Sequence, residues 1–144
     1  MTQENKDLLL KDLCGRIPYG VKMNHIADDE HSPKTLLGIA KDMITLQGLG
    51  GYECVDVEHY KPYLFPLSNM TEEQYESLKE SGILSNCSHS YEYVNPHIHG
   101  VSFIFKGFKT YSLELIEWLN KNHFDYRGLI PMGLAIDCTN LNIY

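Results

Sequence analysis

The segment that most constrains the fold runs from Tyr111 to Asp137, YSLELIEWLNKNHFDYRGLIPMGLAID, and contains the only tryptophan of the chain. Three apolar side chains recur there at the spacing of one helix face: Leu115, Ile116 and Leu119. This spacing predicts an amphipathic helix over residues 112–122, and Ser112 is a suitable N-cap. We expect Trp118 and Phe124 to be largely buried, so that the helix and the following turn are fixed to a sheet.

The residues after this helix predict a structured turn. Asp125 and Arg127 can pair their charges across it, and Gly128 permits a sharp exit of the chain. In this interpretation the two charged residues organise the turn. The alternative is that Asp125, Tyr126 and Arg127 form an exposed recognition tip for a binding partner.

Length and composition predict a single domain over residues 1–144, because a chain of this size with 43% hydrophobic and 22% charged residues can bury a core. The formal net charge of -7 makes nucleic acid an unlikely partner, since duplex binding requires a basic face. No apolar run approaches the length of a membrane span, and the N-terminus lacks a signal-peptide pattern. The expectation is a cytoplasmic protein without a membrane segment.

Residues 18–67 are predicted to be mainly β, after a first helix over residues 3–14 that ends at Gly15. The span 34–47 has two interpretations, either two strands that turn at Lys41 and Asp42 or one helix, because its periodicity does not separate them. Residues 61–67 contain two prolines, which predicts an edge strand or an extended segment.

A second helix is predicted over residues 70–82, where Thr71 and Gln74 form a capping box. Its apolar face is thin, which favours a position on the surface. A polar loop or irregular strand over 85–98 and a strand over 99–105 follow. The predicted fold class is α+β, with a small antiparallel sheet or an SH3-like or Sm-like curled barrel against which the helices pack.

Four side chains that can bind a metal fall within a short span: Cys87, His89, His97 and His99. Cys87 and His89 are two residues apart, and so are His97 and His99. On a strand, the two members of each pair therefore point to the same face. Thiolate and imidazole are the usual ligands of zinc, which makes zinc the alternative to an absence of cofactors. The competing interpretation is a polar surface loop, because the spacing matches no standard zinc signature.

Three segments carry a resemblance to a known family: LCGRIPYGVK at 13–22, YKPYLFPLSNMTEEQY at 60–75 and EWLNKNHFDYRGLIPMGLAID at 117–137. They resemble small proteins of prophages and other mobile elements of gut bacteria. The resemblance implies a cytoplasmic accessory protein and no particular activity. The histidine cluster lies outside these segments.

The leading functional hypothesis is a non-enzymatic binding or adaptor module with a protein partner, because no complete catalytic set is recognisable and tyrosine is common at protein contacts. The first alternative is a metal-dependent hydrolase, for example a phosphodiesterase, that uses the His/Cys cluster. The second alternative is single-stranded nucleic-acid binding by a small barrel with aromatic stacking platforms.

Overall fold

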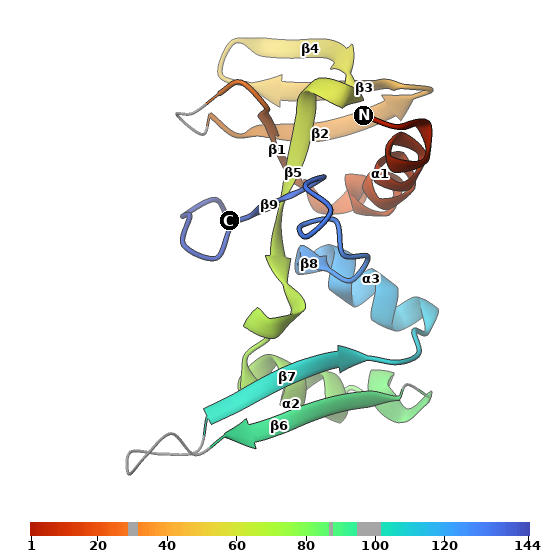
Figure 1. Cartoon of the computed structure of the whole chain (residues 1–144), viewed down its shortest axis with the longest axis vertical. Helices are drawn as coiled ribbons and strands as arrows, with labels where there is room; N and C mark the ends of the chain where they lie inside the picture. The colour runs from red at the N-terminus through yellow and green to blue at the C-terminus, as the bar shows by residue number, and fades with distance from the viewer. Residues whose placement is uncertain (29–31, 87, 95–101) are drawn as a thin grey trace.

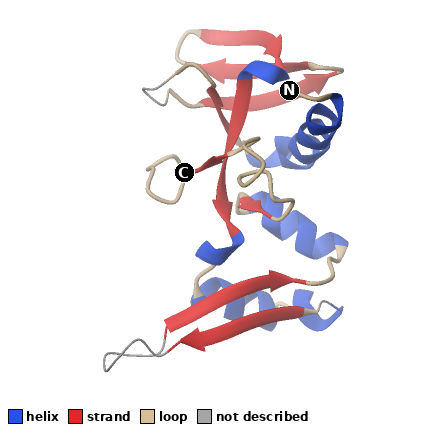
Figure 2. Ribbon diagram, viewed as in Figure 1, coloured by secondary structure: helices blue, strands red, loops and turns tan. Residues whose placement is uncertain are grey.

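A mostly antiparallel sheet with helix α1 and a separate two-stranded sheet with helix α2 form the two ends of the molecule (Figure 1). The computed structural model describes residues 1–28, 32–86, 88–94 and 102–144. The larger sheet has the strand order β4-β3-β2-β1-β5-β8, and β9 also pairs with β5. The α+β prediction is confirmed, and the sheet in the described residues is open, with no closed barrel (Figure 2).

The N-terminal part of this sheet is a meander of three strands, β2 (Lys34–Ala40), β3 (Met43–Gly48) and β4 (Gly51–Asp56). The two-strand interpretation of residues 34–47 is therefore correct, and the helix interpretation is wrong. Lys41 adopts a left-handed φ of 56° at the turn between β2 and β3. The β2–β3 register shifts between Leu36 and Gly38, which marks a bulge.

Strand β5 (Tyr60–Pro66) lies in the interior of the sheet, so the edge-strand prediction for residues 61–67 is wrong. Its first half pairs antiparallel with β1 (Lys22–His25). Its second half pairs in parallel with β9 (Ile136–Asp137) and β8 (Phe124–Asp125). Because no single neighbour borders its whole length, the strand accommodates prolines that cannot donate to a continuous ladder.

Helix α1 (Gln3–Arg16) packs on the larger sheet and continues through Gly15, so the prediction that Gly15 ends the helix is wrong. The helix is followed by a 3-10 turn (Ile17–Tyr19) that ends at Gly20 with a left-handed φ of 65°. Gly15 serves close packing instead, because a Cβ atom built on it would lie 2.7 Å from Nδ2 of Asn120 in α3. The first hydrophobic cluster joins α1 to the sheet through Leu9, Leu13, Met23, Leu36, Ile44 and Leu64.

The smaller sheet contains β6 (His89–Val94) and β7 (Ser102–Phe108), which pair antiparallel. Residues 89–94 of the predicted loop or irregular strand form the regular strand β6, and the described part of the predicted strand 99–105 lies in β7; residues 87 and 95–101 lie outside the described residues. Helix α2 (Glu72–Glu80) has both hydrogen bonds of the predicted capping box. It is not merely superficial, because Tyr75 and Leu78 are buried in the second hydrophobic cluster.

Helix α3 (Leu113–Lys121) connects the two ends of the molecule and begins after the predicted N-cap Ser112. Phe124 is 2% exposed, as expected, and belongs to the second cluster. Trp118 is only partly buried, although its ring stacks on that of Phe124 at a centroid distance of 5.7 Å. Three further 3-10 turns occur at Val57–His59, Leu67–Asn69 and Ile83–Asn86. Over the described ranges, every helix is too short or too polar to cross a membrane.

Candidate functional site

Three residues of the predicted zinc site, Cys87, His97 and His99, lie outside the described residues. The fourth, His89, begins β6, and its Nε2 lies 2.9 Å from the hydroxyl of Tyr75. This contact ties the β6–β7 sheet to helix α2. Within the part of the chain that the structure describes, no three His, Cys, Asp or Glu side chains are arranged to hold a metal ion.

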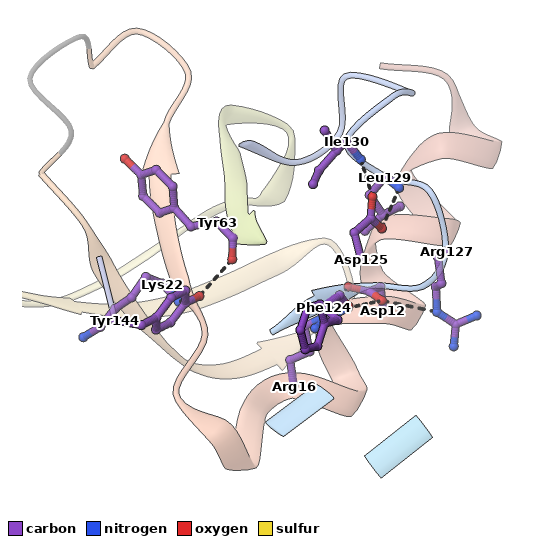
Figure 3. Close-up of polar contacts among 10 residues, drawn as sticks. All are labelled: Asp12, Arg16, Lys22, Tyr63, Phe124, Asp125, Arg127, Leu129, Ile130 and Tyr144. Carbon is purple, nitrogen blue, oxygen red and sulfur yellow. Dashed lines mark hydrogen bonds and ion pairs between the residues drawn. The ribbon is translucent and has the colours of Figure 1, made fainter. Parts of the chain in front are cut away.

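Of the predicted recognition residues, Asp125 ends β8, and Tyr126 and Arg127 follow in the turn; Figure 3 shows Asp125 and Arg127. Both carboxylate oxygens of Asp125 accept backbone N–H groups 2.8 Å away, one from Leu129 and one from Ile130. Asp125 therefore organises the turn, as expected. The expected charge pair between Asp125 and Arg127 is absent.

Arg127 pairs instead with helix α1, and its Nε lies 3.3 Å from Oδ1 of Asp12 (Figure 3). Its guanidinium also lies over the ring of Tyr126, 4.9 Å from the centroid. Asp12 is fully buried and also binds Arg16, which in turn donates to the Phe124 carbonyl at 2.8 Å. These contacts tie the 123–130 turn to α1, so we assign the turn a structural role.

The open edge of strand β4 is the candidate binding surface. It pairs with β3 along its whole length, from Met43↔Asp56 to Gly48↔Gly51. In the described residues no strand pairs with its other edge, which lies at one end of the long axis of the molecule (Figure 1). An open edge presents unpaired backbone donors and acceptors to a second chain.

The backbone hydrogen bonding shows which residues of β4 face the open edge. The Val57 N–H donates to the Asp42 carbonyl at 3.0 Å, and in an antiparallel ladder the bonded and non-bonded pairs alternate. Glu53 and Val55 therefore direct their N–H and C=O groups toward β3. The corresponding groups of three residues point away from the sheet: Tyr52, Cys54 and Asp56.

The side chains around this edge are exposed and partly apolar. Tyr52 is 72% exposed, and Leu49 at the tip of the β3–β4 hairpin is fully exposed. Met43 on the neighbouring strand β3 is also exposed, and Cys54 is a free, exposed cysteine. An apolar group of this kind at a sheet edge has the composition of a protein contact.

The inner face of β4 is tied to the sheet by a partly buried polar triangle of Lys34, Glu53 and Tyr60. The Glu53 carboxylate accepts from Lys34 Nζ at 2.6 Å and from the Tyr60 hydroxyl at 2.8 Å. These two hydrogen bonds, that of Lys34 first, lower the pKa of Glu53. Burial is the main cause of the raised pKa of Tyr60, which therefore stays protonated at neutral pH. The strand is consequently preorganised for docking.

The far end of β4 is acidic. Lys6 of α1 is buried and lies within 3.5 Å of three carboxylates: Asp42, Asp56 and Glu58. Burial opposes the charge of Lys6, but its bonds to Glu58 and Asp42 outweigh burial and raise its pKa. A backbone hydrogen bond from Glu58 is the main cause of the lowered pKa of Asp56. One ammonium thus faces three partly exposed carboxylates, which leaves an excess of negative charge.

The fold and this edge define the chain as an α+β protein with an open, meander-edged sheet. No protein-family model, curated protein or solved structure matches it.

Sequence reasoning placed β4 within the predicted β region 18–67 but assigned the sheet edge to residues 61–67. Gly48, Gly50 and Gly51 were the local signal for β4, because clustered glycines indicate a tight hairpin turn and the strand after such a turn can be the last strand of a meander. The prolines of β5 were a misleading signal. They indicated an edge strand, whereas β5 lies inside the sheet and changes its neighbouring strands along its length.

Proposed function

We propose that this chain is a protein-binding module that takes up an extended segment of a partner protein as an additional strand along β4. The observation that carries this proposal is the open edge of β4 with the outward backbone groups of Tyr52, Cys54 and Asp56. Strand addition gains affinity from main-chain hydrogen bonds, and pockets for alternate side chains give specificity.

The surroundings of β4 specify the chemistry of the partner segment. Apolar or aromatic residues of the segment would lie against Tyr52, which is 72% exposed on β4. A Lys or Arg of the segment would lie near Asp56, where one ammonium faces three carboxylates. Opposite charge on the partner fixes the register and accelerates association. The resemblance to accessory proteins of mobile elements is compatible with an adaptor role of this kind.

The alternative of nucleic-acid binding by a small barrel loses its basis, because the sheet is open and the chain carries a net charge of -7. No contact among the described residues favours the metal-dependent hydrolase.

A displayed library of random linear peptides, selected on the whole chain, tests the proposal. We expect the selected peptides to combine apolar residues with Lys or Arg, and to bind in an extended conformation. Their binding should protect the amides of Tyr52, Cys54 and Asp56 from hydrogen exchange.

The decisive variant is Cys54→Pro, because it removes an outward N–H without removing a hydrogen bond to β3. Cys54→Val is the matched control, since it keeps the N–H and favours a strand. We expect the selected peptides to bind the Val variant like the original chain and to lose at least about tenfold in affinity for the Pro variant. Equal binding to both variants, or amide protection elsewhere on the sheet, contradicts strand addition along β4.

A further inference from the structure

A second feature, independent of β4, is a cavity of about 320 Å³ between the end of β5, the start of α2 and the turn after α3. Its volume lies at the lower end of the range for small-ligand pockets, about 300–1,000 Å³. Three aromatic side chains form its walls: Phe65, Phe124 and Tyr144. The remaining lining side chains are polar, and none of them carries a carboxylate.

Three side chains of this lining carry an amide group, and in each of them either the nitrogen or the oxygen makes a hydrogen bond within the protein. Asn122 donates its Nδ2 to the Trp118 carbonyl, and Asn69 donates its Nδ2 to the Thr139 hydroxyl. Gln74 uses its Oε1 to accept the N–H of Thr71 in the capping box. The unused halves are two acceptors, on Asn69 and Asn122, and one donor, on Gln74.

The only cationic side chain of the lining is Lys121 at the end of α3. Because its lining side chains include one ammonium and no carboxylate, the cavity favours an anion over a cation. Lys121 is exposed, so its ammonium is free to reach a bound ligand.

His123 is the least ordinary residue of the lining. It holds a left-handed φ of 57°, a conformation that is uncommon for a non-glycine residue. Its ring stacks on that of Tyr144 at a centroid distance of 3.8 Å and an interplanar angle of 9°. Its Nδ1 is buried without a hydrogen-bond partner.

We propose that this cavity binds a mononucleotide. The planar base would lie against the wall formed by Phe65 and Tyr144, where stacking is available to any base. Donors and acceptors on the base edge would bind the unused amide groups of Asn69, Gln74 and Asn122. The phosphate would pair with the ammonium of Lys121.

Isothermal titration of the full chain with each of the four common ribonucleoside monophosphates tests this inference. At least one of them should bind saturably below about 1 mM. The matching nucleoside and inorganic phosphate alone should each bind about tenfold more weakly or not at all, because each offers only half of the interactions. A short single-stranded oligonucleotide, added in a separate titration, distinguishes a free nucleotide from the end of a nucleic acid.

Two variants locate the binding. Lys121→Gln keeps the length of the side chain at an exposed position and should weaken the nucleotide, but not the nucleoside, by about tenfold. Lys11→Gln, at an exposed position on α1, is its control and should change neither. His123→Asn tolerates the left-handed backbone and should weaken both ligands, with folding checked by circular dichroism.

The inference is overturned if none of the four nucleotides binds below about 1 mM, or if Lys121→Gln binds the nucleotide as tightly as the original chain. Tight binding of inorganic phosphate alone also overturns it, because the aromatic wall would then have no role. None of these outcomes affects the strand-addition proposal, which rests on the opposite end of the chain's sheet.

Discussion

Arg16 donates two hydrogen bonds to the carboxylate of Asp12, from Nε at 2.6 Å and from Nη2 at 3.1 Å, and both side chains are fully buried. The pair lies where α1 meets the turn after α3, since Arg16 also donates to the Phe124 carbonyl. It fixes the first helix to the segment that connects the two ends of the molecule. Four predictions follow from this arrangement and its surroundings.

Asp12→Ala should lower the free energy of unfolding by about 3–5 kcal/mol, because it leaves the Arg16 guanidinium buried without its counter-charge. Urea denaturation measures this. Asp7→Ala on the exposed side of the same helix should cost well under 1 kcal/mol, about the value of a surface substitution. The double variant Asp12→Leu with Arg16→Met should recover much of the loss, since it removes both charges. A small loss in Asp12→Ala would show that Arg16 finds other partners.

Phe124→Ala should cost about 3–5 kcal/mol, the usual range for a large aromatic side chain removed from a core. Trp118→Ala should cost less, although it is the larger residue, because its ring is only partly buried and stacks on one side of Phe124. Thermal unfolding followed by near-ultraviolet circular dichroism gives both values. An equal or larger loss for Trp118 would mean that the tryptophan is held in the core.

The stability of the chain should fall as the pH drops from about 6.5 to about 4, and His123 contributes to this fall. Burial, with the charges of Arg16 and Lys22 acting in the same direction, lowers the pKa of His123 to about 4. Below the pKa that His123 has in the unfolded chain, this side chain is protonated in the unfolded state but stays neutral in the folded state. Lowering the pH therefore favours unfolding.

The effect of His123 should be about 1–3 kcal/mol once solvent screening is considered. It is isolated by comparing the original chain with His123→Gln at pH 7.5 and pH 4, both by urea denaturation. The variant should lose less stability between the two pH values. Identical losses would show that carboxylates alone cause the acid sensitivity.

Gly15→Ala should destabilise the chain by about 1–3 kcal/mol, although alanine normally favours a helix over glycine. The added methyl group would lie 2.7 Å from Nδ2 of Asn120, which is itself buried. Asn120→Ala removes this obstacle, so the double variant should be more stable than the sum of the two single changes predicts. Additive losses would indicate that Asn120 simply moves aside.

Local sequence signals predicted the helices well. Ser112 and Thr71 each accept the N–H of the third helical residue, as their positions before apolar runs indicated. The strands over 34–47 were predictable only as one of two alternatives, because the order of apolar residues there is compatible with both the helical and the strand periodicity. Only the tertiary structure decided which further strands they pair with, β1 for β2 and β4 for β3.

The sequence by itself determined the α+β class and the capped ends of α2 and α3, because caps and amphipathic spacing act within a few residues. Only the tertiary structure decided that Arg127 pairs with Asp12 rather than Asp125, and that β4 rather than β5 lies at the sheet edge. Both depend on which distant segments meet: Asp12 and Arg127 are brought together by the docking of α1 on the 123–130 turn. The energy of such contacts comes from burial between elements, which no local pattern of residues encodes.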